Sequence, residues 1–267
     1  MKRIAVVMTK IQALAAVGCD MPTSKIKSRL GNPDMRTGKF SDDMVILEKH
    51  GGVIVLSDVA SLAQVAVMPA LQGRVMTSTA TGPLGQSFGW INADLLQSAQ
   101  TLQHMNPYGG EDRFWMGPEG GQFSIFFAKG TPFDLKHWFT PAAIDTQRFE
   151  VVSKSRTSAV FHQLIKLPNY SGTKFEVDVR REIRLLATDE AWSKLGLAPM
   201  VTVRLVAFES VNTITNAGKE PWEKETGLLS IWILGMFNPS PATTIVIPIK
   251  PEKEPGLNPA APRVKDD

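Results

Sequence analysis

Residues 174–186 read KFEVDVRREIRLL, and this stretch decides the fold class. Its apolar residues Phe175, Val177 and Val179 alternate with charged residues. Because successive side chains of an extended strand point to opposite faces, this alternation predicts a β-strand with one face toward a core and the other toward water.

The same pattern recurs along most of the chain, where short runs rich in Val and Ile are separated by Gly, Pro and polar residues. At least three strands are expected between residues 45 and 81, and further strands at QFSIFF (122–127), RFEVVSKS (148–155), SAVFHQLIKL (158–167), MVTVRLVAFESVNTIT (200–215), GLLSIWILGMF (227–237) and TTIVIPI (243–249). Only residues 91–105 and 189–196 predict short helical turns. The sequence therefore predicts an all-β chain that forms an antiparallel sandwich.

The distribution of charge argues against a nucleic-acid partner. The chain has 29 Lys and Arg against 26 Asp and Glu, and three of the basic residues precede Cys19. From Cys19 onward the two signs balance, and the one basic cluster is the short VRREIR at residues 179–184. A surface that binds duplex nucleic acid needs a concentrated basic face, so we expect no such partner.

Residues 1–19 have the order of a bacterial lipoprotein signal. Two basic residues lead into an apolar stretch, and the small residues at 16–18 precede Cys19, the only cysteine. This order predicts a lipid anchor on the Cys19 thiol, and hence attachment to a membrane on the periplasmic side of a bacterial envelope. Because Lys10 and Gln12 interrupt the apolar stretch, an N-terminal strand followed by a short helix remains the alternative.

The remaining chain divides into three parts. Residues 20–39 predict a linker, residues 40–250 a single globular domain, and residues 251–267 a disordered tail that is rich in Pro and poor in apolar side chains. No stretch beyond residue 19 approaches the roughly 20 consecutive apolar residues of a membrane-spanning helix.

Cofactor and metal motifs are missing from the sequence. The glycine-rich stretches at 82–89 and 109–121 match neither the dinucleotide fingerprint nor the phosphate-binding loop, and GxSxG does not occur. The four histidines have no metal-binding spacing: His50, His104, His137 and His162. We therefore expect no cofactor and no metal site.

The candidate ligand site is GGEDRFWMGPEGGQF, residues 109–123, where Gly and Pro predict two turns. The stretch gathers three acids, a guanidinium and an indole: Glu111, Asp112, Arg113, Trp115 and Glu119. An exposed Trp can stack on the C–H face of a sugar while charged groups bind its hydroxyls, so the residues predict carbohydrate binding. A loop held by its own ion pairs is the alternative.

A second set of such residues follows in TPFDLKHWFTP, residues 131–141, with Asp134, His137 and Trp138. The candidate acids and bases for catalysis are Glu111, Asp112, Glu119 and His137, provided that two of them meet across one groove. The candidate substrate-binding side chains are Arg74, Arg113, Trp115 and Trp138.

The stretch at residues 109–127, together with QGRVMTSTATG (72–82) and residues 211–249, resembles an uncharacterised bacterial envelope family related to the aldose 1-epimerase, or galactose mutarotase-like, superfamily. The resemblance covers residues 40–250. It implies an antiparallel β-supersandwich whose concave face binds a monosaccharide or a carbohydrate chain, with Arg74 near the sugar. A structural salt bridge is the alternative role for Arg74.

The chain departs from this superfamily at two points. The turn at residues 215–222 is similar to one that precedes a strand with a catalytic histidine, but here that strand, GLLSIWILGMF, has none. The resemblance also implies that the C-terminal strands with the catalytic base are missing. Two functions therefore stay open: a carbohydrate epimerase, isomerase or lyase, or a non-catalytic lipoprotein that is sugar-binding, structural or degenerate. The oligomeric state stays open too.

Overall fold

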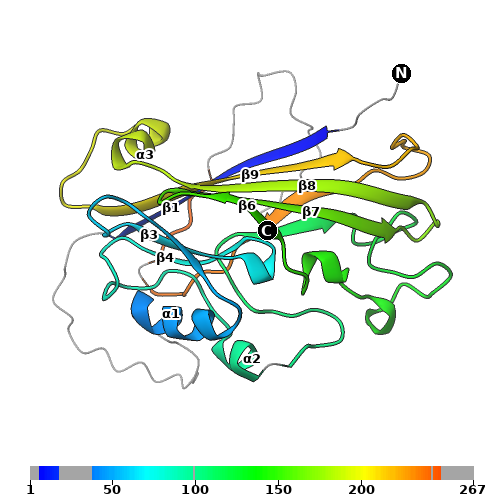
Figure 1. The fold of residues 1–267 in the computed structure, drawn as a ribbon, viewed down its shortest axis with the longest axis horizontal. Coiled ribbons are helices and arrows are strands. Elements are labelled where there is room, and N and C mark those ends of the chain that lie inside the picture. Colours follow the sequence, from blue (N-terminus) through cyan, green and yellow to red (C-terminus); the bar gives the residue numbers. More distant parts are fainter. Residues whose placement is uncertain (1–5, 18–37, 99, 242, 248–267) are drawn as a thin grey trace, which may run out of the picture.

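The computed structural model describes residues 6–17, 38–98, 100–241 and 243–247, and for residues 6–17 it describes only the course of the backbone. Two antiparallel β-sheets lie face to face in the middle of the molecule, with helices on their outer sides (Figure 1). The predicted all-β class with antiparallel sheets is confirmed.

The first sheet has five strands in the order β1, β9, β8, β7, β6. Their bounds are β1 Val6–Val17, β6 Glu150–Lys154, β7 Ser158–Pro168, β8 Lys174–Leu185 and β9 Arg204–Asn216. In β8 the side chains of Phe175, Val177 and Val179 are buried, and the charged residues between them are not. The alternation that the sequence predicted is therefore present, and it continues inward to Arg181.

The second layer consists of a three-stranded and a two-stranded sheet, which we describe together as the second sheet. Its strands are β2 Ile54–Ser57, β3 Gln64–Met68, β4 Arg74–Thr79, β5 Arg113–Gly117 and β10 Ser230–Leu234. A backbone bridge between Val75 and Asp112 joins β4 to β5, so the strands follow one another as β2, β3, β4, β5, β10.

One apolar core fills the space between the two sheets. It includes Val67 and Val75 from the second sheet and Phe161, Val179 and Phe208 from the first, all buried. Each such side chain contributes about 1.5–3 kcal/mol through removal of its surface from water. This core fixes which face of each strand points inward.

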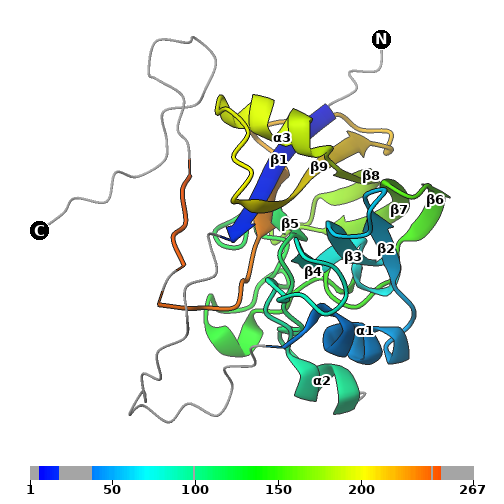
Figure 2. The ribbon, with the colours of Figure 1, turned by 90° about the vertical axis from the view of Figure 1, so that its left-hand side faces the viewer.

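Helices cover the outer faces of both sheets (Figures 1 and 2). Their bounds are α1 Phe40–Lys49, α2 Ala93–Ser98 and α3 Thr188–Leu195, with short 3-10 turns η1 Pro69–Leu71, η2 Leu135–His137 and η3 Ala142–Ile144. Helices α1 and α2 lie over the second sheet, and α3 packs on β9 through Trp192. The sequence predicted α2 and α3 but not α1.

Two expected strands are not strands in the structure. Residues 122–127 form turns instead, in which Ser124, Ile125 and Phe126 are buried one after another. The backbone N–H groups of Ser124 and Ile125 donate to the nearby carbonyls of Gly121 and Pro118, so they form turns and not the ladder of a strand. Residues 243–247 also form no strand within the described part of the chain.

The expected lipid anchor at Cys19, most of the linker at 20–39 and the tail at 251–267 lie outside the described residues. Residues 6–17 form β1, which runs antiparallel to β9 from the Val6–Thr215 pair to the Val17–Arg204 pair. In the described ranges no helix is long and apolar enough to cross a membrane.

Candidate functional site

The stretch at 109–117 begins as a turn and continues as a strand. Gly109 and Gly110 have φ angles of 91° and 112°, in the left-handed region that the sequence expected for a turn. The chain then enters β5, whose five residues are all buried between β4 and β10. The polar residues of this stretch therefore face the interior of the protein rather than solvent.

Asp112 lies between the two sheets in an ion pair with Arg181 of β8. The Asp112 carboxylate also accepts a hydrogen bond of 2.8 Å from Ser210 Oγ. Arg181 donates through Nε to the Gly73 carbonyl and through Nη1 to Asn212 Oδ1. Both charged groups are buried and hydrogen-bonded inside the protein, which leaves Asp112 no position from which to contact a substrate.

Arg113 points the other way from Asp112 and pairs with Asp145, at 2.7 Å between Nη2 and Oδ1. Its guanidinium also lies 4.2 Å from the centre of the Trp115 ring. Burial lowers the pKa of Arg113, and the charge of Asp145 opposes this shift. The Asp145 carboxylate in turn accepts from the Asn106 amide, so Arg113 belongs to an internal network.

Trp115 corrects a prediction, because its ring is only 2% exposed and does not face solvent. Its Nε1 donates to Glu119 Oε1 at 2.7 Å, and its ring packs against Phe126 and Trp232. The turn that carries Glu119 is therefore tied to the indole by a side-chain hydrogen bond. The stacking surface that the sequence predicted is thus an internal contact.

Glu111 has a pKa that is raised toward neutrality. Its side chain is buried, accepts from Ser78 Oγ at 2.9 Å, and packs against Gly89. Burial raises the pKa of Glu111 to about 7, and the charge of Asp112 adds to the increase, whereas the hydrogen bonds from Ser78 and Gly89 oppose it.

The resemblance implied that Arg74 lies near a sugar, but in the structure Arg74 is fully buried. It donates to the Gly109 carbonyl at 3.0 Å and to Gln72 Oε1 at 3.2 Å. Burial lowers the pKa of Arg74, and the charge of Arg113 adds to this decrease. Its observed partners assign Arg74 to the support of the turn before β5.

The second predicted set stays at the surface. His137 Nδ1 lies 2.6 Å from Asp134 Oδ1, and this contact lowers the pKa of Asp134. Trp138 is half-buried and stacks on Phe126 at 5.1 Å, so the aromatic rings of the two sets meet through Phe126. Among the described residues, no hydrogen bond or ion pair joins His137 to any of the three candidate carboxylates.

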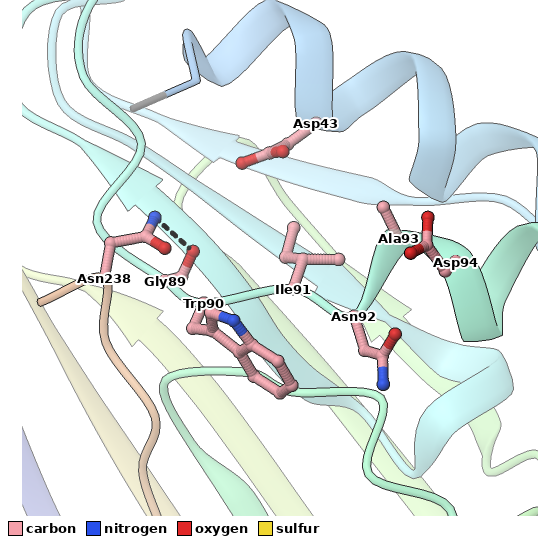
Figure 3. Close-up of a pocket in the computed structure, with 8 residues that line it drawn as sticks. All are labelled: Asp43, Gly89, Trp90, Ile91, Asn92, Ala93, Asp94 and Asn238. Atoms are coloured by element: carbon pink, nitrogen blue, oxygen red, sulfur yellow. Dashed lines mark hydrogen bonds between the residues drawn. The ribbon is translucent and has the colours of Figure 1, made fainter. Parts of the chain in front are cut away.

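The structure has a pocket that the sequence analysis missed, which we call the Trp90 pocket (Figure 3). It is lined by Asp43, Gly89, Trp90, Ile91, Asn92, Ala93, Asp94 and Asn238. Its volume is about 40 Å³, so it is a shallow site at the surface. The segment after Gly89 forms one side, and α1 supplies Asp43 from the other, as Figure 3 shows.

The walls of the Trp90 pocket are held by hydrogen bonds. Asn238 Nδ2 donates to the carbonyls of Gly89 and Ser87, at 2.9 and 3.0 Å, and Ser87 Oγ donates to the buried Asp43 carboxylate. Asn92 Oδ1 accepts from the Leu95 amide and so caps α2. These contacts fix the polar groups at the rim before any ligand binds.

Three polar atoms of the pocket have no hydrogen-bond partner among the described residues. They are Trp90 Nε1 and Asn92 Nδ2, which are donors, and Asn238 Oδ1, which is an acceptor. The Trp90 ring is half-exposed beside them. The short sequence GWIN already contained this pairing of an indole with an amide, but only the fold adds Asn238.

Within the described part of the chain, no group of three or more His, Cys, Asp or Glu side chains could hold a metal ion. Comparison with known proteins gives one match. Residues 38–261 match the model of a family of unknown function (DUF6786). No curated protein and no solved structure matches the chain.

Proposed function

The chain belongs to the DUF6786 family, and we propose that it binds carbohydrate in the Trp90 pocket without carrying out catalysis. The observation that carries the proposal is the half-exposed Trp90 ring at a rim where two donors and one acceptor have no hydrogen-bond partner in the described part of the chain. Sugars present an apolar C–H face and hydroxyl groups that both donate and accept hydrogen bonds. The pocket offers a complement to each of these features.

The size of the pocket supports recognition of a sugar edge. Pockets that enclose small molecules measure about 300–1,000 Å³, much more than this one. A site of about 40 Å³ has room for the hydroxyl groups on one edge of a sugar ring while the ring lies across Trp90. Such contact suits one residue of a carbohydrate chain, bound weakly.

The positions of the candidate catalytic residues favour binding over catalysis. Asp112 is in a buried ion pair, Glu119 accepts from Trp115, and His137 pairs with Asp134. An acid and a base must reach the same substrate to open a sugar ring or to eliminate from it. None of these groups lines the Trp90 pocket.

Acid–base chemistry by Glu111 is the second candidate function, because its pKa of about 7 suits proton transfer near neutral pH. Glu111 packs directly behind Gly89, a residue of the pocket wall. If Glu111 reacts, Glu111→Gln abolishes sugar conversion and leaves sugar binding intact. If no conversion of any bound sugar occurs, this second function is rejected.

The binding proposal is tested by two pocket variants and one control. Trp90→Ala removes the ring, and Asn92→Asp keeps the acceptor that caps α2 while replacing the free donor by an acceptor. We expect affinity for carbohydrate chains to fall about tenfold or more in each. The control is Trp232→Ala, an exposed Trp outside the pocket.

The measurement is a screen on an oligosaccharide array followed by isothermal titration of the hits. Equal loss of affinity in Trp90→Ala and Trp232→Ala would place the site elsewhere. An array without hits would reject carbohydrate as the ligand.

The proposal includes the cellular setting expected from the sequence. A lipid on Cys19 tethers the domain to the bacterial envelope on the periplasmic side, where it meets carbohydrate chains. Relationship to the galactose mutarotase-like superfamily is also part of the proposal. It is supported by two antiparallel sheets packed face to face.

A further inference from the structure

The loop at residues 129–139 exposes apolar side chains that no described element covers. Leu135 is 83% exposed, Phe133 53% and Phe139 38%. Exposed apolar residues are common singly, but three within seven residues form a patch. We call this segment, with its two lysines, the apolar loop.

The two aromatic side chains of the apolar loop pack against neighbouring rings. The Phe133 ring contacts the rings of Phe127 and Tyr170 at 4.9 and 4.5 Å between centres, and Phe139 stacks on His104 at 4.7 Å. At the tip, Leu135 begins the short η2 turn. Side chains that are already ordered lose little conformational entropy on binding, and this favours binding through the apolar loop.

The charged side chains of the apolar loop indicate which kind of surface the loop binds. Lys129 and Lys136 are exposed on either side of Phe133 and Leu135. Asp134 is the acid of the loop. Its carboxylate contacts the His137 ring and accepts a hydrogen bond from the His137 backbone N–H. The loop therefore offers exposed apolar groups flanked by two lysines that form no ion pair with any described residue, the combination that binds a membrane surface with anionic headgroups.

We propose that the apolar loop docks the protein on an anionic lipid bilayer. Leu135 and Phe133 enter the boundary between headgroups and acyl chains, and Lys129 and Lys136 lie at the lipid phosphates. Two lysines and a few apolar side chains give weak, reversible binding. The loop thus sets the orientation of the domain at a surface and does not replace a lipid anchor.

Vesicle co-sedimentation of the full chain tests this proposal. The protein carries Cys19→Ala, so that no acyl chain contributes, and is mixed with vesicles of phosphatidylcholine alone or with added phosphatidylglycerol. We expect binding only to the anionic vesicles, with loss at high salt because screening removes the contribution of the lysines.

Three variants separate the contributions. Leu135→Asp should lower the partition coefficient about tenfold, and Lys136→Ala about fivefold. The matched control, Val201→Asp, changes a 95% exposed side chain outside the loop and should bind as the parent does. Both apolar changes are at exposed positions, so all proteins should have the same thermal midpoint.

Three results would overturn the proposal. The first is no binding of the parent to anionic vesicles, and the second is an equal loss of binding in Leu135→Asp and Val201→Asp. The third is a dimer in size-exclusion chromatography that Leu135→Asp dissociates while vesicle binding is absent, because the loop would then contact a second copy. Sugar affinity should stay unchanged in Leu135→Asp, so failure here is distinct from failure of the carbohydrate proposal.

Discussion

The Asp112 carboxylate and the Arg181 guanidinium form an ion pair that connects the two sheets through the middle of the core. Arg181 occupies an inward position of β8, in line with Val177 and Val179, and Asp112 precedes β5 in the opposite sheet. Their pairing explains why Asp112 follows the Gly109–Gly110 turn: the turn brings its carboxylate to a buried cation.

Removal of one partner of this pair should strongly destabilise the protein. Arg181→Met leaves the Asp112 charge buried without its cation, and we expect the free energy of unfolding to fall by about 3–5 kcal/mol. Urea denaturation followed by circular dichroism measures it. The control is Lys166→Ala, which breaks the exposed Lys166–Glu176 pair and should cost less than about 1 kcal/mol. Similar losses in both variants would show that the buried pair is not a major support.

The stability of the protein should depend on the proton bound by Glu111. Burial raises the pKa of Glu111 from 4.5 to about 7, so between these pH values the folded state keeps a proton that the unfolded state has lost. The contribution of Glu111 to the free energy of unfolding is thus greatest below pH 4.5, and it decreases by roughly 3 kcal/mol as the pH rises to 7. Denaturation curves at a series of pH values measure this decrease.

Glu111→Gln removes this titration and should make the protein more stable than the parent above pH 7. The matched control is Glu150→Gln at an exposed position of β6, which should leave the pH profile of the parent unchanged. A profile that is the same for the parent and Glu111→Gln would contradict a raised pKa.

Close packing of Gly89 should couple the fold to the Trp90 pocket. A Cβ atom at Gly89 would lie 2.1 Å from the Met76 carbonyl oxygen, so Gly89→Ala must move the segment that carries Trp90. We expect a loss of about 2 kcal/mol in stability and weaker carbohydrate binding. Gly120→Ala is the control, because no atom lies within 4 Å of its Cβ position. Unchanged carbohydrate binding in Gly89→Ala would show that the close contact between Gly89 and Met76 does not position the Trp90 pocket.

Residues 6–17 can be either a strand of the folded protein or part of a cleaved signal, and the two roles exclude each other. Residues 6–17 pair with β9 as strand β1, yet a signal peptidase would remove the same residues before Cys19. If the lipoprotein prediction is right, the protein from the membrane fraction of a bacterial host begins at Cys19, incorporates labelled palmitate, and loses the label in Cys19→Ala. Intact mass spectrometry decides. A soluble protein that retains residue 1 would assign residues 6–17 to the sheet.

The strands were predictable wherever one face of a strand is buried and the other is wet. β8 was predicted from the alternation at Phe175, Val177 and Val179, because a period of two is a local property of the chain. Helix α1 was not predicted, since its buried residues Phe40, Asp43 and Leu47 include a charge. Residues 122–127 were predicted as a strand from their apolar composition, but they form turns with consecutive buried side chains.

The sequence by itself determined the all-β class, the positions of most strands and the left-handed turn at Gly109 and Gly110, because these depend on neighbouring residues. Only the tertiary structure decided the environment of the polar residues that follow. The partners of Asp112 and Arg113 lie 69 and 32 residues away, at Arg181 and Asp145. A sequence shows which groups can form an ion pair, but burial and distance arise only when the two sheets close on one another. Pairing of β10 with β5 and a backbone bridge between Gly89 and Phe237 bring Asn238, 149 residues beyond Gly89, to the Trp90 pocket.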